Sequence, residues 1–387
     1  MAGLRDKLRR LTPAAPAAAP AARPPTAGMT LHSERFAPED PWGYPAADLA
    51  GVDLNSLCRF CCGRGVDSRW DRVAFIDTET TGLAGSATAV FLLGIGRLDP
   101  DGGLTVRQAF MEDYDGEEAL MDFLEQQLAD VEVIVSFNGK SFDVPQLKTR
   151  QILLGRRGYD WDRLVHMDLL HPARAVWKLR LARSNLTHLE RALLGVAREG
   201  DVDGAEIPGR YFAYLQDRDF APMAEVLQHN RWDIRALVAL CVRLGRALQD
   251  PSAETYPEDL YSLGRAMGRR KRFEDAADCY LLAQRGSVTG AARLELSLIY
   301  KRQGAYEQAA RLWRQMIQSA QGGLAPYEEL AKYYEHRLKD PDRALAVTNQ
   351  ALRLIARVGG GQTAALDRRK ARLEEKLTRQ REKERFS

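Results

Sequence analysis

The sequence has no long hydrophobic run, few cysteines and almost no net charge. No apolar stretch in its 387 residues approaches the roughly 20 residues that a membrane-spanning helix needs. The formal net charge is only +3, so any contact with nucleic acid must come from local patches and not from the overall field. The N-terminus has no secretory hydrophobic region, and we therefore expect a cytoplasmic protein without a membrane partner.

The chain has five cysteines, and three of them, Cys58, Cys61 and Cys62, lie close together. One C-x-x-C without a second pair, or without a histidine at zinc spacing, is a weak metal signal. Reduced thiols in a cytosolic protein are the alternative. The sequence leaves both interpretations of these cysteines open.

Changes in composition and periodicity divide the chain into segments. Alanine and proline dominate residues 12–28, a composition that cannot build a core. Strand and helix patterns become regular from Val73 onward. The predicted segments are a disordered tail at 1–28, an N-terminal extension at 29–72, an α/β domain at 73–250, helical repeats at 256–356 and a charged C-terminal helix at 357–387.

The segment 73–250 has the pattern of a mixed sheet flanked by helices. Strands are predicted at 73–78, 90–98, 104–111 and 131–137. The turn sequence DPDGG after Leu98 indicates a hairpin, so the first three strands form an antiparallel meander. A helix at about 116–129 separates the third strand from the fourth, which is expected to run parallel to the first. This order of elements defines an α/β fold.

The last third of the chain has no strand pattern and repeats at about 33 residues. The repeated positions are Leu263, Phe273, Ala276, Ala277 and Tyr280, which recur as Leu296, Tyr306, Ala309, Ala310 and Trp313. Small residues beside an aromatic at this period are typical of paired helices in a solenoid. The segment resembles tetratricopeptide repeats, and a generic helical bundle is the alternative.

Two carboxylates stand at the end of the first strand of the α/β domain. The apolar run that begins at Val73 leads directly into Asp77, and Glu79 follows two residues later. Side chains two apart on a strand share a face, so both acids can project into the same cleft. Gly82 then permits a sharp turn. Taken alone, the two acids could equally belong to an ordinary turn.

Two further carboxylates lie later in the chain. Asp143 occurs in FNGKSFD, just after the strand at 131–137, and Asp233 occurs in HNRWD on a long helix. His229 lies four residues before Asp233 and therefore on the same helix face. In isolation, Asp143 could be a helix N-cap, and His229 with Asp233 could be a surface pair.

Four carboxylates in one cleft would repel one another unless cations neutralised them. Oxygen ligands alone suit Mg²⁺ or Mn²⁺. Two such ions about 4 Å apart would hold the attacking and leaving oxygens of a phosphodiester displacement. A neutral His229 could take the proton of the attacking water. The residue types therefore predict phosphodiester chemistry, provided that the four acids converge.

Three motifs, DTETTG, FNGKSFDVP and HNRWD, occur in that order over about 160 residues. They resemble motifs of the DEDD 3′–5′ exonucleases of the ribonuclease H-like superfamily. More closely, 73–248 resembles the bacterial YprB-type ribonuclease H-like domain, through SFNGKSFDVP, DLLHPARAVW and HNRWDI. The resemblance implies a metal-dependent 3′–5′ exonuclease on single-stranded DNA or RNA. It also implies that two Mg²⁺ (or Mn²⁺) ions are bound by Asp77, Glu79, Asp143 and Asp233.

The resemblance implies roles for neighbouring residues as well. His229 is the candidate general base, and the residues that the resemblance places against the substrate are Thr81, Gly82, Leu83 and Asn138. Lys140 is added to them as a basic residue near the site that could contact a phosphate. The histidine departs from the pattern, because three residues separate it from Asp233 where the better-known families have a tyrosine with three or a histidine with four. One helical position is a rotation of about 100°, so the imidazole could aim elsewhere. Asp168 is an additional carboxylate candidate, with a structural role as its alternative.

Other functions fit parts of the sequence. The α/β domain could be a non-catalytic nucleic-acid-binding module with the repeats as a protein-interaction scaffold, or the repeats could be the main functional part with the first domain regulatory. Four acids that face a polyanion argue against a pure binder. We expect nucleic acid as the substrate and a protein partner on the concave surface of the repeats.

Overall fold

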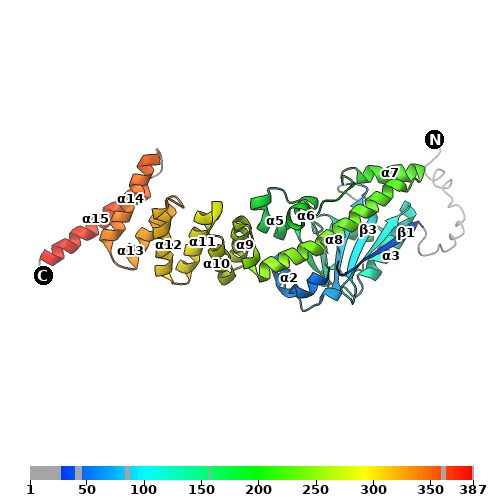
Figure 1. Ribbon diagram of the computed structural model, residues 1–387, viewed down its shortest axis with the longest axis horizontal. Helices are drawn as coiled ribbons and strands as arrows, with labels where there is room; N and C mark the ends of the chain where they lie inside the picture. The colour runs from blue at the N-terminus through cyan, green and yellow to red at the C-terminus, as the bar shows by residue number, and fades with distance from the viewer. Residues whose placement is uncertain (1–27, 40–45, 83–87, 157, 359–362, 386–387) are drawn as a thin grey trace, which may run out of the picture. The chain divides into compact units, whose positions relative to one another are not determined.

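The structure is a computed structural model that describes residues 28–39, 46–82, 88–156, 158–358 and 363–385 (Figure 1). The predicted disordered tail at 1–28 therefore lies, apart from Gly28, outside the described residues. The chain divides into two compact units. The first comprises the described parts of 1–50, 67–168 and 198–239, and the second comprises those of 51–66, 169–197 and 240–387.

The first unit is built on a six-stranded sheet with the strand order β1-β4-β3-β2-β5-β6. Its strands are β1 (Met29–Phe36), β2 (Val73–Thr80), β3 (Val90–Leu98), β4 (Leu104–Met111), β5 (Val133–Ser136) and β6 (Val165–Asp168). The pairs β1–β4, β4–β3 and β3–β2 are antiparallel, whereas β2–β5 and β5–β6 are parallel. The prediction of an antiparallel meander followed by a strand parallel to the first is confirmed.

Strand β1 extends the meander from within the predicted N-terminal extension. It pairs with β4 along its whole length, from Met29 opposite Met111 to Phe36 opposite Leu104. Only Met29 of the strand is buried, and Leu31 is exposed. An edge strand with so little buried surface has no clear alternation of apolar and polar residues, and for this reason the sequence does not predict it.

Four helices of the first unit are α3 (Glu117–Gln127), α4 (Asp143–Leu153), α7 (Ile207–Asp217) and the part of α8 (Ala221–Gln249) that ends at Ala239. Their apolar faces share one core with β2, β3, β4 and β5. Within it, the ring of Tyr211 from α7 stacks on that of Phe91 from β3, with centroids 4.0 Å apart. The core thus fixes the helices against the sheet whose strand ends carry the acidic residues.

Helix α8 approaches strand β3 closely at Gly94. A Cβ atom on Gly94 would stand 2.1 Å from the Oδ1 atom of Asn230 on α8, which is far inside any allowed contact. Gly94 is also the register partner of Asp77 on β2. The absent side chain therefore lets α8 lie against the sheet at the strand position that carries the first predicted acid.

In the described residues of the second unit, every element of regular secondary structure is a helix. Its helices are α2 (Leu54–Cys62), α5 (Leu170–Leu181), α6 (Leu186–Leu194), the rest of α8, α9 (Pro257–Arg269), α10 (Phe273–Leu282), α11 (Thr289–Arg302), α12 (Tyr306–Gln318), α13 (Ala325–His336), α14 (Pro341–Val358) and α15 (Ala364–Arg385). Helices α9 to α14 form three successive pairs. The expected all-helical region of packed helix pairs is confirmed.

The recurring residues of this region form its core. Leu263 and Leu296 are fully buried, and so are Ala276 and Ala309. They are the positions that repeat in the sequence, so the repeat reflects the contact between paired helices. Helix α15 packs through three buried leucines, Leu366, Leu373 and Leu377.

The three clustered cysteines all lie on α2. Cys58 is buried, and the thiol of Cys62 donates a hydrogen bond to the backbone carbonyl of Cys58 over 3.0 Å. All five cysteines lie in the described residues, and no disulfide joins any of them. None of the described helices is both long enough and apolar enough to cross a membrane.

Candidate active site

Asp77 and Glu79 lie near the C-terminal end of strand β2, and their side chains project from the same face of the sheet. Both residues are partly buried. Asn230 on α8 donates a hydrogen bond from its Nδ2 atom to the Oδ2 atom of Asp77 over 2.7 Å. The register between β2 and β3 shifts between Glu79 and Thr80. Such an irregularity re-aims side chains at the edge of a site, and here it directly follows the two acids.

Asp143 joins the pair from the start of α4. Its Oδ1 atom accepts hydrogen bonds from the backbone N–H of Thr78, over 3.1 Å, and from the Thr78 hydroxyl, over 2.5 Å. The N-cap position of α4 belongs to Phe142, so Asp143 does not cap its own helix. The preceding turn packs tightly, since a Cβ atom on Gly139 would stand 3.0 Å from the Oδ2 atom of Asp143.

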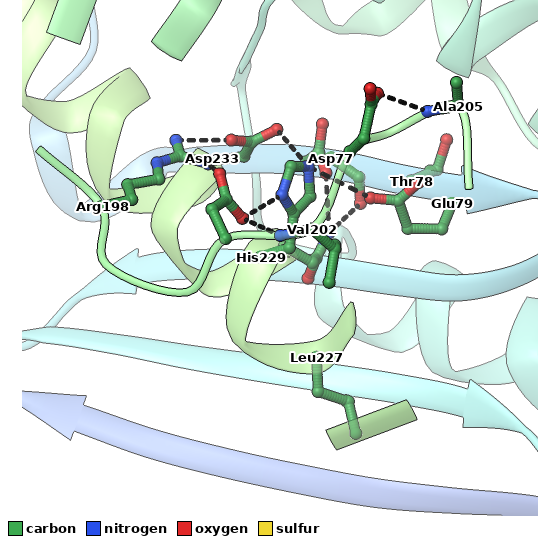
Figure 2. Close-up of polar contacts among 12 residues, drawn as sticks. Asp77, Thr78, Glu79, Arg198, Val202, Ala205, Leu227, His229 and Asp233 are labelled. Carbon is green, nitrogen blue, oxygen red and sulfur yellow. Dashed lines mark hydrogen bonds and ion pairs between the residues drawn. The ribbon is translucent and has the colours of Figure 1, made fainter. Parts of the chain in front are cut away.

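Helix α8 brings His229 and Asp233 to the same place (Figure 2). The Nε2 atom of His229 lies 3.6 Å from Asp233 Oδ2 and 3.9 Å from Glu79 Oε1. The helix packs on β3 in such a way that a histidine four residues before the aspartate does face the carboxylates. The unusual spacing therefore does not direct the imidazole away from the acids.

Two residues of the site, Arg198 and Asp201, were not predicted from the sequence. The Nη2 atom of Arg198 lies 2.6 Å from Asp233 Oδ1, and its Nη1 atom lies 3.2 Å from Asp201 Oδ2. Asp201 accepts a hydrogen bond from His229 Nδ1 over 2.6 Å. Both residues lie in the polar connection between α6 and α7, where no periodicity or motif distinguishes them from ordinary loop residues.

The electrostatics of the acids are unusual. Burial, followed by repulsion from Asp233, Glu79 and Asp143, holds the pKa of Asp77 well above its usual range. Burial also raises the pKa of Glu79 to about 8, with repulsion from Asp233 and Asp143 added to it and His229 acting against it. Burial raises the pKa of Asp143 to about 6 despite the opposing hydrogen bonds from Thr78. The fold thus holds acids together at a cost in free energy.

His229 responds to the same field with the opposite sign. Burial alone would lower its pKa, but the hydrogen bond to Asp201 and the charges of Asp233 and Glu79 raise the pKa to about 9. The pKa of Asp201 is lowered, because the hydrogen bond and charge of His229 outweigh the effect of burial. Asp201 therefore favours the protonated form of the imidazole, whose second nitrogen faces the other acids.

The donor set suits a hard divalent cation. All four predicted ligands are carboxylates, and desolvation raises the pKa values of three of them, Asp77, Glu79 and Asp143, which a bound cation would lower. In the part of the chain that the structure describes, no three His, Cys, Asp or Glu side chains are arranged to hold a metal ion as they stand. Asp233 instead faces Arg198, and Asp143 faces Thr78. The residues fit the ion chemically, and the side chains would have to turn toward it.

The other predicted residues lie on the turns that follow β2 and β5. Thr81 accepts a hydrogen bond from the backbone N–H of Ala89 over 2.9 Å, next to a partly buried Gly82, and Leu83 lies outside the described residues. Asn138 and Lys140 are exposed. Their backbone N–H groups donate to Asp168, over 2.9 Å and 3.0 Å. Asp168 is 3% exposed and thus fixes the turn that leads to Asp143.

Comparisons with known proteins agree with this architecture. The family model of the RNase H superfamily matches residues 74–245. A protein of Bacillus subtilis (strain 168), "Uncharacterized protein YprB", is 35% identical over 311 residues, which are 79% of this chain and 75% of that protein. The family B DNA polymerase of the hyperthermophilic archaeon Pyrobaculum calidifontis is 18% identical, over 60% of this chain and 29% of the polymerase chain. Its TM-score of 0.34 is too low to support an argument.

The mixed sheet with its flanking helices is thus a domain of the RNase H superfamily, followed by a region of packed helix pairs. The 311 residues aligned with the Bacillus subtilis protein are too many to fall within the sheet domain alone, so the similarity includes both parts. The chain belongs to the family of YprB.

Proposed function

We propose that the chain is a divalent-metal-dependent nuclease that hydrolyses phosphodiester bonds, as a 3′–5′ exonuclease on single-stranded nucleic acid. The observation that carries the proposal is the meeting of Asp77, Glu79 and Asp143 with His229 and Asp233 at one end of the sheet. Buried acids that raise one another's pKa values are typical of a site that takes up a charged ligand.

The acids and the histidine would divide the work between them. Asp77, Glu79, Asp143 and Asp233 would hold two Mg²⁺ or Mn²⁺ ions, which, when bound, supply a nucleophilic water and neutralise charge on the phosphate. His229 would hold or move a proton at Nε2, the atom that faces Glu79 and Asp233. Asn138 and Lys140, exposed on the turn before α4, would contact the substrate together with Thr81, Gly82 and Leu83.

Cleavage of a panel of substrates tests this proposal. Single- and double-stranded DNA and RNA are incubated with the full chain in Mg²⁺, in Mn²⁺ and in EDTA. We expect products from single strands only when a metal is present. Absence of cleavage from all four substrates in both metals would contradict the proposal.

One observation favours a second candidate, a non-catalytic nucleic-acid-binding module. The Nη2 atom of Arg198 lies 2.6 Å from Asp233 Oδ1, so a cation of the protein itself already neutralises part of the acidic charge. Titration calorimetry separates the two candidates. The nuclease requires Mn²⁺ binding that is lost in Asp77→Asn, whereas a pure binder requires no metal at all. The helix pairs, which we take as tetratricopeptide-like repeats, would contact a partner in either case.

A further inference from the structure

The helix pairs carry two grooves at equivalent positions of successive repeats. The first groove, of about 420 Å³, is lined by α9, α10 and α11, and the second, of about 220 Å³, is lined by α11, α12 and α13. Phe273 and Tyr280 line the first, and Tyr306 and Trp313, which occupy the same repeat positions, line the second. The two grooves are therefore one feature that the repeat presents twice.

Both grooves carry an excess of positive charge. Arg265, Arg269 and Arg302 line the first groove against Glu295 alone. All three arginines are exposed, and the ion pairs of the described residues do not include them. In the second groove the ratio is the same, since three cations, Lys301, Lys332 and Arg337, face one carboxylate, Glu329. The occupant that complements both grooves is an anion with repeated charges.

Each groove also holds an arginine over an aromatic ring. The Cζ atom of Arg302 lies 4.5 Å from the ring centroid of Phe273, and that of Arg337 lies 4.1 Å from the centroid of Tyr306. Arg337 additionally donates a hydrogen bond to the Tyr306 hydroxyl. Both arginines are exposed on their other side. The ring thus fixes the guanidinium plane and reduces the entropy that a ligand would otherwise have to remove.

We propose that the two grooves bind single-stranded nucleic acid. A guanidinium held on one face offers its N–H edge to a phosphate and its free face to a base, and both contacts are common in single-strand recognition. An acidic protein segment would use only the edge, and would leave the repeated stacking arrangement without a purpose. The inference rests on the proposed function, in which a single strand is the substrate, and adds a second contact with that strand in the helical region.

Fluorescence anisotropy tests the inference on the full chain. The probe is a labelled single strand of about 30 nucleotides, long enough for several contacts, and EDTA is present so that nothing is cleaved. The variant is Arg302→Ala/Arg337→Ala. The matched control is Arg353→Ala/Arg357→Ala, which removes two exposed arginines of α14 that line neither groove.

We expect the groove variant to bind about tenfold more weakly or worse, since both stacking positions are lost. Its slope of log affinity against log salt should fall by about 1.4, because two phosphate contacts are removed. The control should bind like the wild type, and thermal melting should show that both variants fold.

The outcomes separate this inference from the nuclease assignment. If the wild-type chain binds and cleaves the strand but the groove variant keeps its affinity and salt slope, the inference is wrong and the nuclease assignment stands. If the wild-type chain binds no single strand in EDTA but cleaves one in Mn²⁺, the inference fails and the nuclease assignment stands. Equal weakening of the groove variant and its control would also overturn the inference, because the arginines would then act only through overall charge.

Discussion

Glu79 on β2 and Glu335 on α13 are carboxylates whose side chains are only 15% and 1% exposed, yet their pKa values are shifted in opposite directions. Burial raises the pKa of Glu79 to about 8, and its acidic neighbours add to the effect. Burial would also raise the pKa of Glu335, but hydrogen bonds from Arg372 and Lys376 outweigh burial and lower the pKa to about 2. The same side chain is thus placed in two opposite environments.

The difference separates a structural cluster from a site that is prepared for a ligand. The side chain of Glu335 is only 1% exposed. It accepts hydrogen bonds from Lys376 over 2.7 Å, from Arg372 over 2.9 Å and from Arg369 over 3.2 Å. The three cations of α15 neutralise the charge of Glu335, and these ion pairs hold α15 against α13. At the C-terminal end of β2, the cations that the described residues place in ion pairs with the acids of the site are Arg198 and His229. The remaining charge is a cost that a bound cation would remove.

The largest expected effect is on cleavage. Asp77→Asn should lower the rate of single-strand cleavage at least about a hundredfold, because it removes a predicted metal ligand. It should not lower the free energy of unfolding, because one source of repulsion disappears. Glu335→Gln is the control, since it makes the same kind of acid-to-amide change in the other unit, away from the site, and should leave cleavage unchanged. A clear loss of stability in Asp77→Asn would break the comparison.

Asp201→Asn should have the next largest effect. The carboxylate that accepts from His229 Nδ1 is replaced by a neutral amide, and the rate should fall about tenfold or more. The pKa of the imidazole should fall too, which an NMR titration of His229 would show. Mn²⁺ affinity measured by calorimetry should stay close to that of the wild type. An unchanged imidazole pKa would contradict the orienting role of Asp201.

Glu335→Gln tests the structural side of the comparison. The substitution leaves three cations without their shared carboxylate and should lower the free energy of unfolding by about 2 kcal/mol. Urea denaturation followed by circular dichroism measures this loss. Wild-type stability in Glu335→Gln would mean that the cluster on α13 is no more than a surface ion pair.

Opposite pH dependence is the smallest of the expected effects. From pH 4.5 to about 8, the unfolded chain releases the Glu79 proton before the folded chain does, so rising pH should lower stability. From pH 4.5 down to about 2, the unfolded chain takes up a proton at Glu335 before the folded chain does, so falling pH should lower stability.

Thermal melting in EDTA measures both arms. Glu79→Gln should flatten the decline above pH 4.5, which in the wild type should exceed about 1 kcal/mol, and Glu335→Gln should flatten the decline below it. Saturating Mg²⁺ should reduce the first decline and leave the second unchanged. A wild-type profile that rises from pH 5 to 8 in EDTA would show that the acids at β2 do not carry the repulsion assigned to them.

The strands and helices of the first unit were largely predictable because their apolar patterns are strong. The buried run into Asp77, the DPDGG turn and the apolar stretch before Asn138 each indicated an element that the structure contains. Strand β1 was missed, since an edge strand with one buried residue gives little pattern. Helical pairing in the last third followed from its repeated leucines and alanines.

The site was only partly predictable. Asp77, Glu79, Asp143 and Asp233 follow strand ends or lie on a helix face, and such positions can be placed from periodicity. Arg198 and Asp201 lie in an irregular connection, and their partners become visible only when the fold brings α8 beside that loop. The direction of the His229 ring depends on how closely α8 lies on Gly94, a packing detail that spacing along one helix does not contain.

The central claim is that the acids at the end of β2 form a nuclease site, and one cleavage experiment tests it most directly. Single strands labelled at the 5′ end, with free or blocked 3′ ends, are incubated in Mn²⁺ with the wild-type chain and with Asp77→Asn/Asp233→Asn. We predict stepwise shortening of the free-ended strand by the wild type, protection by the 3′ block, and no shortening by the double variant. Undiminished shortening by the folded double variant would contradict the account.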